Sequence, residues 1–600
     1  MPLSKIVEQL KVQNRLRVIE QEVDVDLEMA HIAYIEVKKE PSYALLFTNP
    51  VKGEKKFDMP VLMNLFGTYE RTQMLFGRDV EGVANEIEKL LHLKPPQTLM
   101  QKFSMLTDLF ALKNVFPKKL NGRGACQEIV QADVDLTALP ILKTWSEDGG
   151  AFITMGQVYT TSLNGEMVNL GMYRLQVYDK NHLGMHWQIH KDSSHFFDQY
   201  KEAGKRMPVS IAIGGDPLYT WCATAPLPYG VNELLLYGFI KNSPARTVKS
   251  LTNNLYIPED VDIVIEGFVD TSRMKIEGPF GDHTGYYTLE EPYPVMKVET
   301  ITHKKEPIYL ATVVGKPPIE DKFMGWATER IFLPLLKTTA PDLIDYHMPE
   351  NGVFHNLILA KIKPHYKGHA TQIMHAFWGV GQMSFVKHAI FVDENAPKLT
   401  DYDELIRYIL NRFSEKTLLI TKGITDALDH SSNEALIGGK LGIDVTGEIV
   451  ESNFEILSDG ELLKKMQTKA KDIKNLRQYY TDTQNPITVI SIEKERMASE
   501  VFDDIKELKQ HFSLVAIVDE NSNDLDNPYM LVWRVVNNID AGRDIYLNGF
   551  VGIDGTNKNS LDGFERRWPG DVNCEEDLLS SLQERGLIDI DDEFKKKYYL

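Results

Sequence analysis

Apolar residues change their spacing along the chain, and each change predicts a different kind of element. Between residues 78 and 93 they recur at the period of an amphipathic helix. These positions are Val80, Val83, Ala84, Ile87, Leu90 and Leu91, and Pro95-Pro96 follows them. Residues 60–67 have the pattern of a buried strand that enters a loop. Residues 1–120 are therefore predicted to form a mixed α/β domain.

Residues 121–315 have the pattern of short strands separated by turns. Residues 167–178 and 183–190 are predicted to form a hairpin across Asp179-Lys180-Asn181. Further strands are expected at 208–214, 261–269 and 295–302. This middle region is therefore predicted to be a β-barrel or a compact sheet domain.

The second arm of the hairpin alternates apolar and polar residues, which gives a strand one polar face. The side chains on that face are three imidazoles and an amide, at His182, His186, Gln188 and His190. The histidines also lie four residues apart, so a helical stripe of metal ligands is an alternative. The strict alternation and Gly184 favour the strand.

Residues 316–450 return to an α/β pattern, and part of that pattern occurs twice. Phe391-Val-Asp-Glu-Asn is echoed by Ile517-Val-Asp-Glu-Asn, and Gly442-Ile-Asp-Val-Thr by Gly552-Ile-Asp-Gly-Thr. We therefore predict a degenerate repeat of the α/β unit. The expected domains are 1–120, 121–315 and 316–450, followed by a helical connector at 451–510, the repeat at 511–565 and a polar tail at 566–600.

Composition narrows the class of protein. A chain of 600 residues exceeds one hydrophobic core, and a hydrophobic content of 43% is ordinary for a soluble globular protein. The net charge of -20 argues against a general nucleic-acid binder. Cys126, Cys222 and Cys574 are too far apart for a thiolate metal cluster. The start has no signal-peptide pattern and no apolar run has the length of a membrane span, so a cytoplasmic location is expected.

The stretch 274–287 carries candidate chemistry, because Glu277 and Asp282 flank a Gly-Pro-Phe-Gly turn. Such a stiff turn can hold both acids near one point. Two acids held close disfavour double ionisation, so one is expected to keep its proton and serve as a general acid. The alternative is a tight turn whose acids are solvated.

A second set of polar residues lies in the same region, at Asn169, His190 and Glu233. An amide oxygen, an imidazole nitrogen and a carboxylate form a mostly hard ligand set, which suits Mn²⁺ or Mg²⁺. Each residue alone is more often an ordinary satisfied polar group. In a regular strand Asn169 and Arg174 face opposite ways, so we expect a bulge at Gly171 if both serve one site.

These residues resemble the signature of the UbiD family of decarboxylases, which use prenylated FMN. The similar segments are Asn169-Leu-Gly-Met-Tyr-Arg174, His190, Glu233 and Glu277-Gly-Pro-Phe-Gly-Asp282-His-Thr-Gly-Tyr-Tyr. The likeness runs from Pro60 through Gly315-Lys-Pro-Pro318 to Thr446, in the family's order. It implies a multidomain α/β protein with a central split β-barrel of the flavin-reductase type.

The resemblance also implies roles for individual residues. Asn169, His190 and Glu233 would hold a divalent metal, Mn²⁺ or Mg²⁺, on the cofactor phosphate. A K⁺ ion would lie near the carbonyls of Ala223 to Ala225. The expected flavin contacts are Met172, Tyr173, Arg174, Trp187 and Gln188, with Lys387 as a further candidate for the phosphate. Arg174, Glu277 and Asp282 would form the catalytic network.

The chain departs from the family pattern at two of these positions. His186 stands where an arginine contacts the cofactor in close relatives, and Lys191-Asp192-Ser193 replaces an Arg-Gly-Gly run. Lys191 keeps the positive charge there, and both His186 and Lys191 are therefore included among the cofactor-binding candidates.

The expected activity is a reversible, non-oxidative decarboxylation of an aromatic or α,β-unsaturated acid. A hydroxybenzoate or naphthoate precursor of quinone biosynthesis is the leading substrate class. A flavin prenyltransferase would supply the cofactor, and a homo-oligomer is expected. The alternatives are a flavin-binding or metal-binding protein without turnover and an FMN oxidoreductase on a split-barrel scaffold.

Overall fold

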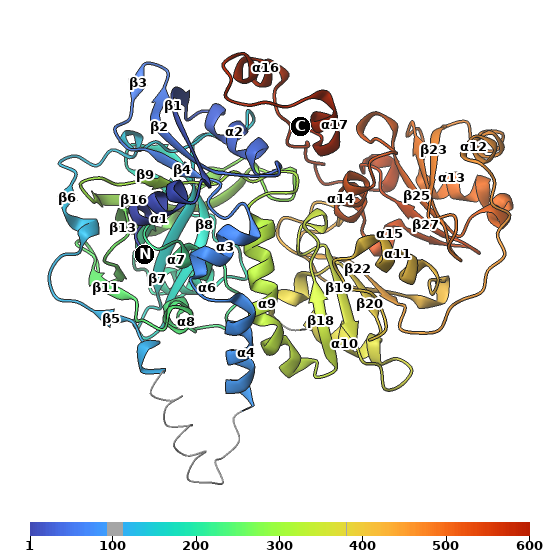
Figure 1. Ribbon diagram of the computed structural model, residues 1–600, viewed down its shortest axis with the longest axis horizontal. Helices are drawn as coiled ribbons and strands as arrows, with labels where there is room; N and C mark the ends of the chain where they lie inside the picture. The colour runs from blue at the N-terminus through green and yellow to red at the C-terminus, as the bar shows by residue number, and fades with distance from the viewer. Residues whose placement is uncertain (93–111, 380) are drawn as a thin grey trace, which may run out of the picture. The chain divides into compact units, whose positions relative to one another are not determined.

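A computed structural model describes residues 1–92, 112–379 and 381–600 (Figure 1). The chain forms two compact units. The first contains residues 1–331 and 571–591, and the second contains residues 332–570 and 592–600. Among the described residues, every helix is too short or too polar to cross a lipid bilayer.

The N-terminal part of the first unit is an α/β layer. Its sheet has the order β1 (Leu16–Asp24), β2 (Ala44–Lys52), β4 (Val61–Met63), β17 (Tyr309–Leu310), with β3 (Lys55–Lys56) paired to β2. Its helices are α1 (Leu3–Val12), α2 (Glu28–Glu36), α3 (Tyr69–Phe76) and α4 (Val80–Leu91). The helix predicted at 78–93 is confirmed as α4, which begins after the cap Asp79. Pro95-Pro96 lie outside the described residues.

The predicted barrel is confirmed in the middle of the first unit. Six strands pair in a closed ring, because β13 pairs with β16 as well as with β10. The ring is β13 (Ile263–Glu277), β10 (Met207–Ile213), β7 (Phe152–Thr161), β8 (Val168–Asp179), β9 (His182–Gly184) and β16 (Glu291–His303). The edge strand β6 (Ile129–Val130) extends β16. Closure leaves few strand edges unpaired, which protects the sheet from adding further chains.

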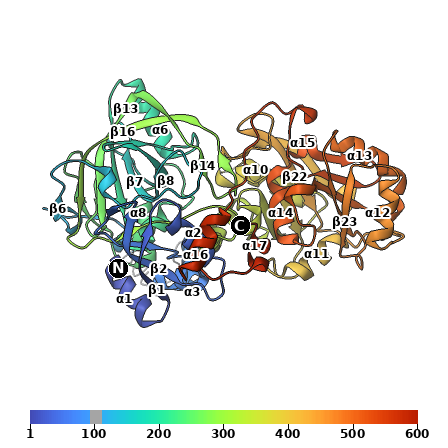
Figure 2. The same cartoon turned by 90° about the horizontal axis from the view of Figure 1, so that it is seen from above.

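Short elements surround the barrel and position the site. The helices α6 (Asp192–Glu202), α7 (Pro217–Cys222) and α8 (Glu233–Lys241) lie against β7 or β8. A hairpin of β14 (Phe280–Gly281) and β15 (Tyr287–Thr288) follows β13, and β12 (Tyr256–Pro258), β11 (Arg246–Lys249) and β5 (Lys118–Lys119) form a small sheet. Near the end of the chain, α16 (Glu576–Glu584) lies against α2 (Figure 2).

Two local predictions in the barrel are wrong. The second arm of the hairpin ends at Gly184, and residues 185–190 leave the sheet. The cause lies in the facing strand, where Pro294 accepts a hydrogen bond from the Met185 amide but has no N–H to return. The polar strand face expected at His186, Gln188 and His190 therefore does not form.

The expected bulge is not at Gly171, which pairs regularly with Val158. The register shifts instead between Ile153 and Gly156 of β7, beside the pairs that flank Arg174. Gly171 has another role, because a Cβ atom there would lie 2.3 Å from the Tyr173 ring. The glycine therefore makes room for an aromatic side chain on its own strand.

The second unit contains two sheets of the same topology, which confirms the predicted repeat. The first sheet has the order β18 (Leu343–His347), β19 (Leu357–Ile362), β20 (His388–Val392), β22 (Ile437–Asp444), β21 (Leu418–Ile424). The second has the order β23 (Ile473–Tyr479), β24 (Ile487–Ile492), β25 (Leu514–Asp519), β27 (Val551–Asp554), β26 (Ile545–Leu547). In each sheet the second, third and fourth strands are parallel.

The helical connector predicted at 451–510 is wrong, because these residues supply the first two strands of the second sheet. The exposed positions of β23 carry Lys474, Asn475 and Arg477, and these polar residues obscured the strand pattern. The helices of the second unit are α10 (His369–Gly379), α11 (Tyr402–Leu410), α12 (Asp459–Gln467), α13 (Ala498–Ile505), α14 (Pro528–Asn538), α15 (Ala541–Asp544) and α17 (Asp592–Tyr598). The boundary between the units falls within α9 (Asp321–Thr339).

The two copies contact each other reciprocally. Asn356, just before β19, donates its amide to Asn537 Oδ1 at the end of α14 at 2.8 Å. Asn485, just before β24, donates to the Leu410 carbonyl at the end of α11 at 2.9 Å. The same two parts of each copy are used in both directions, as in a two-fold symmetric dimer.

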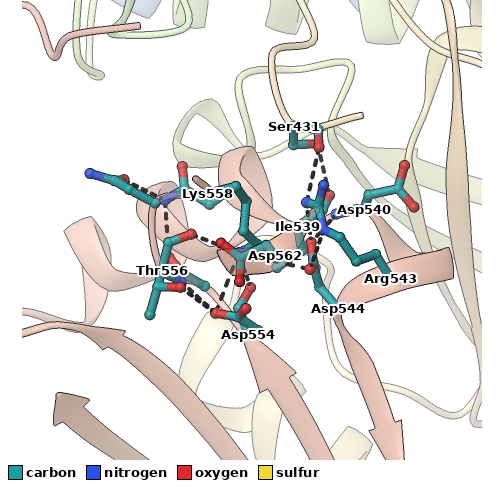
Figure 3. Close-up of polar contacts among 12 residues, drawn as sticks. Ser431, Ile539, Asp540, Arg543, Asp544, Asp554, Thr556, Lys558 and Asp562 are labelled. Carbon is teal, nitrogen blue, oxygen red and sulfur yellow. Dashed lines mark hydrogen bonds and ion pairs between the residues drawn. The ribbon is translucent and has the colours of Figure 1, made fainter. Parts of the chain in front are cut away.

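Buried ion pairs stabilise the second copy around Lys558 (Figure 3). Its amine donates to the carbonyls of Asp554 and Thr556 at 2.8 and 2.6 Å. It also lies 3.3 Å from a carboxylate oxygen of Asp554 and 3.9 Å from one of Asp544, with its own side chain 0% exposed. The cluster therefore ties the end of β27 to α15.

Lys558→Met is expected to destabilise the second copy by about 3–5 kcal/mol, because it leaves the buried carboxylate of Asp554 without its cation, whereas Asp544 keeps Arg543. The control Lys474→Met removes an exposed pair with Glu493 and should change the stability little, because solvent screens such a pair. Hydrogen-exchange mass spectrometry of peptides from β27 measures the difference. Equal exchange in the two variants would contradict the prediction.

Candidate active site

The barrel and the β14–β15 hairpin bring Arg174, Glu277 and Asp282 together. Arg174 Nε donates to Glu277 Oε1 at 3.0 Å, and its Nη1 contacts Asp282 Oδ2. Its Nη2 donates to Thr288 Oγ1 at 3.1 Å. The three charged side chains are 8%, 0% and 10% exposed. One guanidinium thus joins two buried carboxylates that lie on different elements.

Local sequence explains how the hairpin presents Asp282. Gly278 has a φ of +96°, and a Cβ atom at Gly281 would lie 2.3 Å from the indole of Trp145. Only glycine fits both positions without displacement. Asp148 fixes the turn further, because its carboxylate accepts the Gly281 amide at 2.8 Å. The Phe280 ring lies below the guanidinium of Arg174, with its centroid 4.9 Å away.

Each carboxylate also has its own histidine. His186 Nδ1 lies 2.6 Å from Glu277 Oε2, and the ring of Tyr293 packs on the imidazole at 4.3 Å. His283 Nδ1 lies 2.8 Å from Asp282 Oδ1. His186 was predicted to be a cofactor contact, whereas His283 was not predicted to be a site residue. The signal for His283 was its position next to Asp282 in the chain.

The protonation state of Glu277 and Asp282 differs from the prediction that one of them keeps its proton. Burial alone would raise the pKa of both acids, but their partners outweigh it. Arg174 and His186 hold the pKa of Glu277 below its ordinary value. His283 and Arg174 hold the pKa of Asp282 far below its ordinary value. Both acids are therefore ionised near neutral pH, and the prediction that one keeps its proton is wrong for this state.

The histidine beside Glu277 is neutral at the same pH. Burial, followed by the charge of Arg174, lowers the pKa of His186. The same carboxylates raise the pKa of Arg174 against the effect of its burial. The resting cluster is thus one guanidinium with two carboxylates, and it carries no spare proton on either acid.

Two of the three predicted metal ligands lie in contact at the start of α8. Asn169 Nδ2 donates to Glu233 Oε1 at 3.0 Å, and the Leu170 amide donates to Oε2 at 2.7 Å. Ser193 donates to Asn169 Oδ1 at 2.9 Å. His190 lies in the exposed turn before α6. Among the described residues, no three His, Cys, Asp or Glu side chains are arranged to hold a metal ion.

The environment of Glu233 nevertheless suits a cation. Burial raises the pKa of this carboxyl to about 8. No lysine, arginine or histidine of the described residues forms an ion pair with it. A buried carboxylate without a cation is costly, and a bound metal ion would supply the missing charge. Asn169 and Glu233 therefore fit a divalent metal.

Four of the predicted flavin contacts are buried or half-buried. Tyr173 and Trp187 are buried, while Met172 and Gln188 are half-buried. The indole Nε1 of Trp187 is a buried donor without a partner among the described residues. An unpaired buried donor is costly and fits an oxygen-rich ligand, such as a flavin with its phosphate.

The other predicted contacts with the cofactor and with K⁺ have protein partners or lie elsewhere in the fold. Lys191 caps the start of α6. The Ala223 carbonyl, a candidate for the K⁺ ion, accepts the amide of Met172 at 2.9 Å. Lys387 belongs to the second unit, where its amine pairs with Asp429 at 2.9 Å and donates to Ser431 at 2.8 Å. The structure therefore gives Lys387 an internal partner.

A closed barrel holds an arginine between two buried carboxylates, and a guanidinium placed in this way can bind and orient a carboxylate. Family models for the 3-octaprenyl-4-hydroxybenzoate carboxy-lyases match in three parts: an N-terminal domain at 7–91, a Rift-related domain at 118–317 and a C-terminal domain at 322–445 and 454–568. The chain therefore belongs to the UbiD family of carboxy-lyases. The C-terminal model matches two segments, in agreement with the two sheets of the second unit.

Individual relatives support this assignment. A protein of Helicobacter pylori strain J99 is 54% identical over 598 residues, which is 98% of this chain and 97% of the relative. HmfF from Pelotomaculum thermopropionicum, a UbiD-class enzyme solved in complex with FMN, is 25% identical and has a TM-score of 0.63. The match covers 74% of this chain and 94% of HmfF.

A second solved structure shows the same fold. The vanillic acid decarboxylase of Sedimentibacter hydroxybenzoicus is 23% identical, with a TM-score of 0.65. The match covers 78% of this chain and 98% of the decarboxylase. The barrel and its flanking α/β layers are therefore common to this chain and to enzymes of the UbiD class.

Proposed function

We propose that this chain is a prenyl-FMN-dependent, reversible decarboxylase of an aromatic acid of the hydroxybenzoate or naphthoate type. The observation that carries the proposal is the buried guanidinium of Arg174 between Glu277 and Asp282. Prenylated FMN, when bound, supplies the electron sink that loss of CO₂ requires. No side chain of the cluster can take that part.

The chain's own residues have three tasks in this proposal. Asn169, His190 and Glu233 would hold a divalent metal, Mn²⁺ or Mg²⁺, whose charge would attract the cofactor phosphate. Arg174 orients the substrate carboxylate, because a guanidinium offers parallel donors to two oxygens and Glu277 fixes its position. Asp282 donates the proton that replaces CO₂. Since Asp282 is ionised at rest, it must take up a proton before it can act.

The test is direct. The chain is co-expressed with a flavin prenyltransferase, and the absorbance and mass of the bound cofactor are measured. The purified protein is then screened with hydroxybenzoic, naphthoic and cinnamic acids for release of CO₂. We expect a prenylated flavin and release from at least one aromatic acid. A bound flavin with NAD(P)H oxidation and no CO₂ release would overturn the proposal in favour of an oxidoreductase.

Metal binding should depend on pH through Glu233. Below a pKa of about 8 the metal-free carboxyl is protonated, and Mn²⁺ must displace that proton. We expect the Mn²⁺ affinity to rise about tenfold per pH unit up to that value and then to level. Calorimetry in buffers of different ionisation enthalpy measures the released proton.

A matched pair of variants checks that assignment. Glu233→Gln should lose Mn²⁺ and cofactor binding together. Glu166→Gln, which alters an exposed acid in the turn between β7 and β8, should change neither. Unchanged Mn²⁺ affinity in Glu233→Gln would remove Glu233 from the metal site.

A further inference from the structure

Asp282 is ionised at rest, so it must take up a proton before it can donate one. Each decarboxylation consumes one proton at the substrate carbon, so the proton donor must be reprotonated before the next turnover. Arg174 contacts Oδ2 of Asp282 and stabilises its deprotonated form. A group that returns a proton to Asp282 must therefore reach the other oxygen, Oδ1.

His283 occupies that position. Its Nδ1 lies 2.8 Å from Asp282 Oδ1, and its backbone amide donates to the same oxygen at 2.7 Å. The two oxygens of Asp282 are thus divided between two partners, with Oδ2 on the guanidinium and Oδ1 on the imidazole. An imidazole is the side chain best suited to exchange protons near neutral pH.

Access to solvent separates His283 from the other histidine of the cluster. The side chain of His283 is 25% exposed, whereas that of His186 is 8% exposed. His186 is also turned to Glu277 and covered by the ring of Tyr293. Of these two imidazoles, His283 has the better route for a proton from bulk water to an acid.

Charged groups act on His283 from three elements. Asp282 faces it from the hairpin, and Arg174 faces the pair from β8 across Asp282. Asp321, at the start of α9, is a further acid and is half-buried: burial raises its pKa, and the charge of His283 offsets part of that rise. The imidazole therefore interacts with two acids, and one guanidinium contacts the first of them.

We propose that His283 returns a proton to Asp282 after each turnover, and so acts as a relay between solvent and the proton donor. The inference rests on the proposed decarboxylase function and adds the route of the proton. His283 acts through Asp282, so it is a positioning and relay residue and not a group that touches the substrate.

The bond between the ring carbon and the carboxylate breaks, CO₂ leaves, and its bonding electrons remain on the carbon side. Asp282 gives its proton to that carbon and becomes a carboxylate. The protonated imidazole of His283 then gives its Nδ1 proton to Asp282 Oδ1 and becomes neutral. Proton exchange with water restores the imidazole, so each turnover takes one proton from solvent.

Three variants distinguish proton transfer by His283 from a purely structural role of its side chain. His283→Ala removes both the donor and the proton. His283→Asn keeps an amide donor near Asp282 Oδ1 but has no transferable proton. His365→Ala is the matched control, since His365 forms an exposed pair with Asp342 at the same 2.8 Å distance. Each is compared with wild type on the acid that releases the most CO₂ in the screen.

We expect kcat to fall about 10- to 100-fold in both His283 variants, with KM little changed. Added imidazole should restore His283→Ala, because it can enter the vacated space and carry a proton. His365→Ala should match wild type. Full activity in His283→Asn would overturn the relay, since a hydrogen-bond donor would then suffice. Failure of imidazole to raise kcat of His283→Ala would also overturn it.

A measurement independent of turnover tests the contact itself. Infrared difference spectra of the protein without substrate report the carboxyl band of protonated Asp282, and Asp282→Asn identifies that band. In His283→Ala the band should appear at higher pH than in wild type, because the acid has lost an imidazole partner. An unchanged titration would overturn the coupling. If wild type released no CO₂ from any acid while the band still shifted, the proposed function would fail and the contact would stand.

Discussion

Arg174→Met is expected to abolish CO₂ release and to destabilise the first unit by about 3–5 kcal/mol. The guanidinium is the shared partner of two carboxylates that are 0% and 10% exposed. Without it, Glu277 and Asp282 become buried like charges, and at least one must take up a proton to remain inside. The variant therefore loses both the group that orients the substrate and the charge balance of the cluster.

The loss should show in two independent measurements. Decarboxylation falls below detection, and urea unfolding of the barrel, followed by hydrogen exchange in β8 and β13, shifts to lower denaturant. Arg206→Met is the control, because Arg206 forms an exposed pair with Glu299 at 3.2 Å. Such a pair contributes at most about 1 kcal/mol. Wild-type stability in Arg174→Met would contradict the buried cluster.

The pH dependence of stability has a definite sign at this cluster. The pKa values of Glu277 and Asp282 are held below their ordinary values in the folded protein. Their contribution is therefore complete above the ordinary pKa of a carboxyl and is lost as the pH falls through the lowered values. In Arg174→Met this acid-dependent part of the stability should largely disappear.

Long periodic segments were predictable from the sequence because one physical effect dominates them. The helix at Val80–Leu91 has a single apolar stripe and a capping Asp79. The strands β10, β13 and β16 follow runs of buried residues. The repeat in the second unit was visible where buried strands end in Asp-Glu-Asn, but its first two strands were hidden by exposed charges on β23.

Features that depend on tertiary contacts were not predictable. The arm after Gly184 leaves the sheet because Pro294 stands on the facing strand, more than a hundred residues away in the chain. The low pKa of Asp282 depends on Arg174 and His283 together, and a turn with two acids suggested the opposite. His283 was overlooked because its function depends on a contact distance that the order of residues does not give.

The reciprocal packing in the second unit bears on why the chain carries two copies. Asn356 and Asn485 occupy matching places before β19 and β24, and each binds the end of the other copy's helix. A surface of the first copy is therefore covered by a partner in the same chain. Covalent linkage makes this contact independent of protein concentration.

Asp282→Asn is expected to lower product formation by about 10²- to 10⁴-fold while leaving cofactor and Mn²⁺ binding unchanged. The amide has nearly the shape of the acid and can still accept a hydrogen bond from the His283 backbone amide, which lies 2.7 Å from Oδ1 in the wild-type structure. Arg174 stays neutralised by Glu277. The change therefore removes the transferable proton and one negative charge beside Arg174, and it keeps the shape of the side chain.

Cleavage of the carbon–carboxylate bond needs no proton, and this separates Asp282 from Arg174. Asp282→Asn should still exchange labelled CO₂ into the acid, although it forms almost no product. Arg174→Met should lose exchange and product formation together, because the substrate is no longer oriented. Loss of exchange in Asp282→Asn would assign that residue to substrate binding, and full product formation would exclude it as the proton donor. The ratio of exchange to product formation thus distinguishes a group that places the carboxylate from one that protonates the carbon left behind.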